Sequence, residues 1–209
     1  MGNLFDLLQG HLDENVVSHL SNEIGGASQT QTATAAQGII STLLSGLAKN
    51  ASTPEGAASL NNALERDHDG SLLDNLMGML GGGSQAAPEQ SRAMNGAGIV
   101  NHILGPNQSG AIDMISKMSG LDSSKTGNLM TMLAPMVMSM LGKQKQQQGL
   151  DMSGIASLLT NSVGQQRQAG NPLMDMATRF LDKDGDGSML DDVAGMVGNS
   201  LFSSLFGKK

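Results

Sequence analysis

The stretch LMTMLAPMVMSML, from Leu129 to Leu141, is the most apolar part of the chain and decides its fold class. Its 13 residues are too few to span a bilayer, which needs about 20 residues in a helix. Leu and Met dominate the stretch, and both residue types favour helix. It therefore predicts a helix that is buried on all sides in a protein core. The residues that we expect in this core are Leu43, Leu44, Leu47, Leu133, Met136 and Val137.

The rest of the composition also favours helix. The chain of 209 residues has 27 Leu and 16 Met, against 15 Val and Ile together, and it has no Trp or Tyr. The β-branched and aromatic residues that favour strands are therefore scarce. We predict an all-α, multihelical protein that is long enough to bury a sizeable core.

The charge and the missing residue types exclude several classes of protein. The net charge is −7 and the only basic block is the final Gly-Lys-Lys, so we expect no nucleic-acid partner. The absence of Cys excludes disulfides, thiol catalysis and Cys-type zinc sites. The first residues lack the features of a secretory signal, and no segment is a membrane span. We expect a cytoplasmic protein, with release by a non-standard route as the alternative.

The sequence divides into two helical halves. Residues 1–80 form the first half, residues 97–209 the second, and a helix-poor connector rich in Gly, Ser and Gln joins them at 81–96. Within the second half, the Gln-rich segments 143–149 and 164–172 are interpreted as polar connectors. They are the expected sites of extra residues in this half.

The two halves are related to each other in sequence. VVSHLSNEIGG at 16–26 resembles AIDMISKMSGL at 111–121, and LLSGLAKN at 43–50 resembles VMSMLGKQ at 137–144. Each half then carries an acidic turn, which is ERDHDGS in the first and DKDGDGS in the second. Because the three matches follow in the same order, they indicate an internal duplication.

One long stretch resembles a known family. LAKNASTPEGAASLNNALERDHDGSLLDNLMGML, from Leu47 to Leu80, is similar to the bacterial YidB-like family, a domain of unknown function. TGNLMTMLAPMVMSMLGKQ and FLDKDGDGSMLDDVAGM resemble the second half of its longer members. The resemblance implies a bacterial source, an all-helical fold and no established activity, and it brings no catalytic residues.

The second acidic turn has the spacing of a calcium loop. Acidic residues stand at positions 1, 3 and 5 and Gly at position 6, which is the first half of an EF-hand loop. The bidentate Glu of position 12 is replaced by Val193, so neighbouring Asp side chains are expected to complete the shell. The alternative is that the turn only caps a helix, through Ser188 and Asp191. The expected Ca²⁺ ligands are Asp182, Asp184, Asp186, Ser188, Asp191 and Asp192.

The first acidic turn repeats this pattern less completely. It also fits a helix cap, through Ser71 and Asp74, with Asp in place of the usual Glu or Gln. Hard oxygen ligands favour Ca²⁺ here as well. The residues of this weaker expected site are Glu65, Asp67, Asp69, Ser71 and Asp74.

Apolar stripes at both ends of the chain predict self-association. Three of the four Phe lie in these stripes, where chains usually fray, so the stripes need a cover. Either each stripe folds back on its own half, or the first stripe of one copy meets the second stripe of the next and builds a ring or filament. The expected interface residues are Leu4, Phe5, Leu8, Leu201, Phe202, Leu205 and Phe206.

Three functional classes follow from these patterns. The leading hypothesis is a non-enzymatic structural or interaction protein, a calcium-stabilised helical pseudo-repeat that self-associates. The second is a calcium-responsive regulator that binds a protein partner through Met-rich helices. The third is an uncharacterised hydrolase, which would need a pocket with converging His and carboxylate groups; no residue is assigned a catalytic role.

Overall fold

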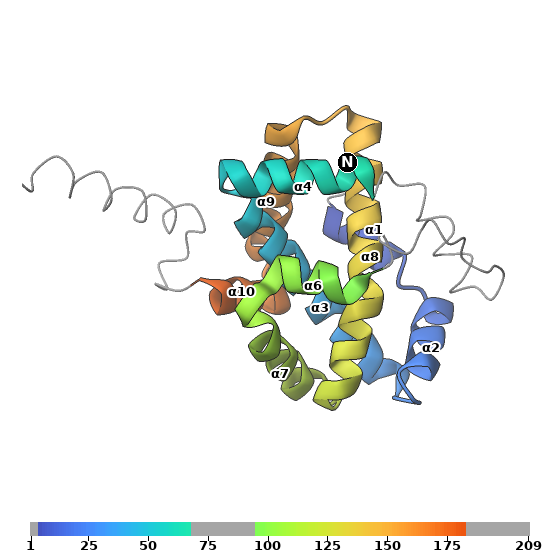
Figure 1. Cartoon of the computed structure of the whole chain (residues 1–209). Coiled ribbons are helices and arrows are strands. Elements are labelled where there is room, and N and C mark those ends of the chain that lie inside the picture. Colours follow the sequence, from blue (N-terminus) through green and yellow to red (C-terminus); the bar gives the residue numbers. More distant parts are fainter. Residues whose placement is uncertain (1–3, 68–94, 183–209) are drawn as a thin grey trace, which may run out of the picture.

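The computed structural model describes residues 4–67 and 95–182, and the chain in these two ranges forms helices and no strand (Figure 1). The prediction of an all-α, multihelical fold is confirmed. The helices, in chain order, are α1 (Leu4–Gly10), α2 (Glu14–Glu23), α3 (Gln29–Ala51), α4 (Pro54–Arg66), α6 (Gly96–Leu104), the 3₁₀ turn η2 (Gly105–Asn107), α7 (Gln108–Ser119), α8 (Ser123–Gln148), α9 (Met152–Gln168) and α10 (Pro172–Leu181).

Helix α3 lies at the centre of the fold. It packs against each of the other described α-helices, so it is covered on all sides. Residues 38–48 are consecutively buried, although several of them are Gly, Ser or Thr. The hydroxyl of Thr42 donates to the carbonyl of Gly38, which satisfies a polar group that would otherwise be costly to bury. The small residues let neighbouring helices come close to the α3 backbone.

Helix α8 is the second buried helix, as the apolar stretch at 129–141 predicts. Residues 133–142 are consecutively buried, and α8 packs along α3 and α6. The core positions expected from sequence are confirmed, because Leu43, Leu44, Leu47, Leu133, Met136 and Val137 are all buried in one hydrophobic cluster.

The corner between α3 and α4 is set by local sequence. The hydroxyl of Thr53 accepts a hydrogen bond from the backbone N–H of Gly56 at 3.1 Å, and Pro54 occupies the first turn of α4. A Cβ at Gly56 would lie 1.9 Å from the carbonyl oxygen of Asn50. Only Gly therefore allows α4 to turn so tightly against the end of α3.

Most of the two Gln-rich segments is helical, and only residues 149 and 169–171 lie between helices. Residues 143–148 belong to α8 and residues 164–168 to α9, and the turns follow at Gly149 and Gly170. Both glycines adopt positive φ angles, 61° and 75°, which end the helices. The interpretation was wrong because Gln and Lys are good helix formers, so a polar run of them continues a helix on its solvent side.

The described parts of the two halves share one hydrophobic core. The cluster runs from Leu4 to Leu181, and α3 of the first half packs on α9 and α10 of the second. The expected connector at 81–96 lies outside the described residues except for its last two, Asn95, which caps α6, and Gly96, the first residue of α6. A Cβ at Gly96 would lie 1.8 Å from the carbonyl oxygen of Thr131, so α6 begins in close contact with α8.

The segments that match between the halves occupy equivalent positions in the helix order. The first pair falls on α2 and α7, and the second pair on α3 and α8. The internal duplication itself stays a prediction. Within residues 4–67 and 95–182, no helix is both long and apolar enough to cross a membrane.

Candidate functional site

A groove lined by α4 and α6 is the candidate site, and Figure 1 shows where these two helices lie. The cavity in it has a volume of about 270 Å³ and is open to solvent on one side. Its floor is apolar and comes from α3, α4, α6 and α8. The floor residues are Leu47, Leu60, Ala63, Ile99, Ile103 and Met138.

Two contacts position the groove at the end of α3. The side-chain amide of Asn50 donates to the backbone carbonyl of Ile103 at 3.2 Å, which ties α6 to α3. A Cβ at Gly46 would lie 2.7 Å from Cγ2 of Ile103, so α3 and α6 are in direct contact there. These contacts hold α6 opposite α4 and leave the apolar floor between them.

The rim of the groove is polar and exposed. Ser59, Asp67 and His102 stand on it, which are the residue types of a hydrolase. Among the interactions of the described residues, no hydrogen bond or ion pair joins these three side chains. A nucleophile needs a base within hydrogen-bond reach, and an orienting group for the base. The groove thus combines an apolar floor with an exposed polar rim.

Glu65, the first residue of the first acidic turn, is paired with a lysine from the other half of the chain. Nζ of Lys145, on α8, lies 2.6 Å from Oε1 of Glu65, at the end of α4. The hydrogen bond from Lys145, with a second from Asn61, holds the pKa of the Glu65 carboxyl below its usual range. Asp67 caps α4 and lies on the groove rim. The remaining members of this expected site, Asp69, Ser71 and Asp74, lie outside the described residues.

The second acidic turn begins in the same way. Nζ of Lys49, near the end of α3, donates a hydrogen bond to the backbone carbonyl of Leu181, the last residue of α10. Asp182 follows as the cap of α10 in an extended conformation. The other expected ligands, Asp184, Asp186, Ser188, Asp191 and Asp192, lie outside the described residues. In the part of the chain that the structure covers, no group of three His, Asp or Glu side chains could hold a metal ion.

The lysine contacts form a reciprocal pair that sequence reasoning missed. A lysine of the first half, Lys49, reaches the second turn, and a lysine of the second half, Lys145, reaches the first. Each lysine stands near the end of a long buried helix, in LAKN and in GKQK. A positive charge therefore lies beside the start of each turn, paired with the carboxylate of Glu65 at the first turn and with the backbone carbonyl of Leu181 at the second.

The N-terminal stripe is not an exposed interface. Leu4 and Phe5 are 1% exposed and Leu8 is 0% exposed, because α1 packs against α3, α8 and α9 of its own chain. The stripe thus folds back on its own chain and covers both halves. The expectation that these three residues face a second copy is corrected: burial in the monomer already removes their apolar surface from water. Leu201, Phe202, Leu205 and Phe206 lie outside the described residues.

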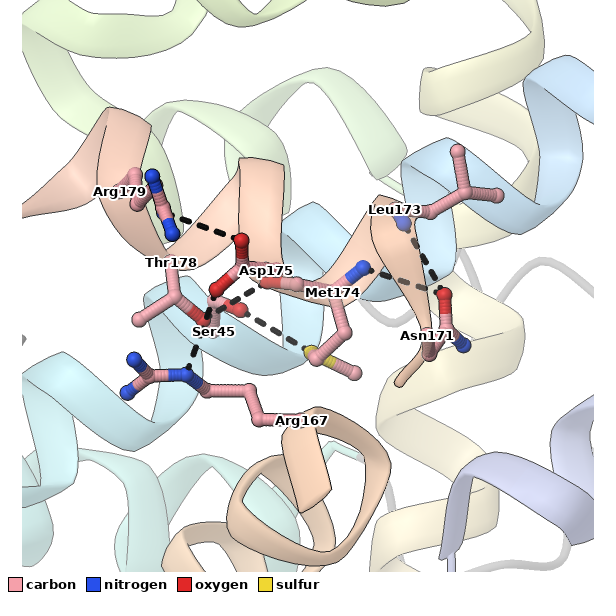
Figure 2. Close-up of polar contacts among 8 residues, drawn as sticks. All are labelled: Ser45, Arg167, Asn171, Leu173, Met174, Asp175, Thr178 and Arg179. Carbon is pink, nitrogen blue, oxygen red and sulfur yellow. Dashed lines mark hydrogen bonds and ion pairs between the residues drawn. The ribbon is translucent and has the colours of Figure 1, made fainter. Parts of the chain in front are cut away.

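Figure 2 shows how α10 is fixed against α3. The side chain of Asn171 accepts hydrogen bonds from the backbone N–H groups of Leu173 and Met174, which caps the helix. Ser45 of α3 donates to the sulfur of Met174 at 3.4 Å. On its outer side, Asp175 pairs with Arg179 at 3.0 Å, and with Arg167 of α9 at 3.8 Å. These contacts therefore fix the first turns of α10 against α3 and α9.

Comparison with known proteins places the chain in a family. The family model described as bacterial protein of unknown function (DUF937) matches residues 6–144, so the chain belongs to this family, in agreement with the YidB-like resemblance. No curated protein and no solved structure matches the chain. The match ends within α8, although α9 and α10 complete the core around α3.

Proposed function

We propose that this member of the family is a non-enzymatic interaction protein whose α4–α6 groove receives apolar side chains of a protein segment, and that its copies self-associate. The observation that carries the proposal is the groove itself. It combines an apolar floor from four helices with an exposed polar rim. Peptide-binding grooves that receive one face of a helix have this composition.

The size of the groove supports a protein ligand over a small molecule. Its cavity of about 270 Å³ lies just below the range of about 300–1,000 Å³ for pockets that enclose drug-sized ligands. The polar side chains among the described lining residues, Ser59, Asp67, Asn95 and His102, are all exposed, so none of them is buried in the groove to orient such a ligand. A few apolar side chains that protrude from a helix suit the space better, because the rest of the helix remains outside.

Self-association is supported by the sequence of the C-terminal stripe. Leu201, Phe202, Leu205 and Phe206 recur at helical spacing and require an apolar cover. Since α1 already lies in its own core, the N-terminal stripe offers no cover to a neighbour. In place of the N-terminal stripe, we propose the α4–α6 groove as the surface that receives the C-terminal stripe.

We propose that calcium binds at the second acidic turn only. Three acids alternate there after α10, and Asp182 stands at the point where the helix ends. At the first turn, Lys145 already neutralises Glu65, which makes that turn a poorer cation site. Bound Ca²⁺ would fix the direction in which the chain leaves α10 and thereby orient the C-terminal stripe.

The test compares two isoleucines that are both half-buried on helices. Ile99 lines the groove on α6, and Ile112 lies on α7 away from it. We expect Ile99→Lys to abolish the assembly that the wild type shows in sedimentation velocity over a concentration series from about 10 μM to about 1 mM. Ile112→Lys is the matched control and should assemble like the wild type. Equal assembly of both variants and the wild type would contradict the groove as the acceptor surface, and circular dichroism checks that each variant is folded.

A further inference from the structure

We propose that residues 193–206 of each chain fold back into the α4–α6 groove of the same chain. This inference rests on the proposed function, because it names the segment that fills the docking groove. Self-association then proceeds by exchange, in which the segment of one copy enters the groove of another. Four features of the molecule support this occupant.

The first feature is the place where the described chain ends. The carbonyl of Leu181 is bound by Lys49, which stands two residues after the groove-floor residue Leu47 on α3. Asn50, the next residue, binds the carbonyl of Ile103, which also lines the groove. The chain therefore leaves α10 at the same end of α3 that forms the groove floor.

The second feature is the length of the link. Ten residues, 183–192, separate Asp182 from the apolar segment, and a chain of that length spans at most about 33 Å, and less when its acidic residues hold Ca²⁺. The 14 residues of the segment would form a helix about 21 Å long. A tether of this length gives an effective concentration in the millimolar range, so an intramolecular contact outcompetes an intermolecular one in dilute protein.

The third feature is the match of chemistry. The segment VAGMVGNSLFSSLF contains no charged residue, and its largest side chains fall on one helical face. Phe202 and Phe206 stand four residues apart on that face, at the spacing with which helices anchor in grooves. A cavity of about 270 Å³ accommodates only a few side chains of this kind.

The fourth feature is charge. Lys208 and Lys209 follow the segment after one residue, Gly207, and Asp67 stands on the groove rim. The protein is acidic, with a net charge of −7, so a basic end is favourably placed against it. A second hollow, of about 280 Å³ beside η2, has Ile112 as its largest apolar residue and otherwise consists of Gly, Pro, Gln and Ser. It fits an apolar helix less well.

The experiment uses the full chain, which has no Cys of its own. Ser59→Cys on the exposed groove rim is combined with Ser203→Cys or Ser204→Cys beside Phe202. At about 1 μM protein, far below the effective concentration of a tethered segment, we expect an intramolecular disulfide in monomeric protein. The control pair joins Ser203→Cys to Ser124→Cys, an exposed residue in the first turn of α8 and 14 residues before the groove residue Met138 (138 − 124). It should form a disulfide about tenfold more slowly or not at all.

Three outcomes would overturn the inference. If the disulfide links only two copies at every concentration, the groove is filled by a second chain, and the proposed function stands without the intramolecular contact. If neither pair with Ser59→Cys reacts, another segment occupies the groove, for which residues 68–94 are the first candidate because Asp67 and Asn95 both line it. If the control pair reacts equally fast, the contact is unspecific. Phe202→Asp with Phe206→Asp should slow the expected disulfide about tenfold or more.

Discussion

Lys145 and Glu65 lie 80 residues apart in sequence, and their charged atoms are 2.6 Å apart in the structure. The pair joins the end of α8 to the end of α4. Asp67, the cap of α4, follows Glu65 by two residues and lies on the groove rim. With the contact of Lys49 at the end of α10, it shows that each long helix sends a lysine to the acidic turn of the other half. Glu65 and Leu181, at the starts of the two turns, thus contact the other half of the chain.

The Lys145–Glu65 pair should make stability depend on acid pH. Because Lys145 lowers the pKa of Glu65 in the folded protein, the pair stabilises the fold fully above the ordinary Glu pKa of 4.5. This contribution is lost as the pH falls through the lower, folded pKa. We expect Lys145→Met to reduce the melting temperature slightly at neutral pH and to have no effect below that pKa, as measured by calorimetry across pH. A loss of stability that is independent of pH would contradict the charge pairing.

Lys49→Met should loosen the end of α10. The substitution keeps the aliphatic packing but removes the donor to the carbonyl of Leu181. A hydrogen bond from a charged group contributes about 1.5–3 kcal/mol, so the amides of the last turn of α10 should exchange with solvent faster. Hydrogen exchange by mass spectrometry measures this, and Lys117→Met, on the exposed side of α7, is the control. Unchanged exchange at α10 would show that Lys49 does not hold the helix end.

Phe5→Ala should destabilise the monomer. Phe5 is 1% exposed in the core, and removing a buried aromatic side chain costs about 3–5 kcal/mol through lost burial and the remaining cavity. Urea unfolding should show this loss at every protein concentration. Met176→Ala, at a position that is 39% exposed, is expected to change stability by about 0.5 kcal/mol or less. If Phe5→Ala weakened assembly and left monomer stability intact, the burial of α1 in its own core would be wrong.

Calcium should stabilise the protein through the second acidic turn. A ligand that binds only the folded state contributes about 2.7 kcal/mol at a hundredfold excess over its Kd. We expect millimolar Ca²⁺ to raise the melting temperature, and Asp184→Ala with Asp186→Ala to remove most of the rise. Asp69→Ala in the first turn should leave the rise unchanged, since Lys145 already neutralises Glu65 there. If Ca²⁺ leaves the melting temperature unchanged, the second acidic turn does not bind calcium and serves as a helix cap.

The sequence predicts those parts of the fold that depend on local patterns. The apolar run at 129–141 identifies a buried helix because no exposed face could be assigned to it, and Thr53 and Pro54 locate the start of α4 because their capping geometry is local. The Gln-rich segments were expected to be connectors and are mostly helical. Their polar composition indicates that they are exposed, but it does not distinguish an exposed helix from a loop.

The candidate site was not predictable in the same way. Its floor draws on α3, α4, α6 and α8, and no short motif brings together Leu60, Ile99 and Met138. The pairing of Lys145 with Glu65 likewise arises only when α8 packs beside α4. The one local indication was the recurrence of lysine near the ends of the two longest helices. Which residue each of these lysines contacts depends on tertiary structure.

The central claim is that the α4–α6 groove is occupied by an apolar segment of the chain. Isoleucine methyl NMR of the full chain tests this most directly, because Ile99 and Ile103 lie in the groove, whereas Ile112 and Ile155 lie elsewhere. Comparing the wild type with Phe202→Asp and Phe206→Asp, we predict that the methyl signals of Ile99 and Ile103 shift and those of Ile112 and Ile155 do not. Unchanged signals of Ile99 and Ile103 would contradict the claim.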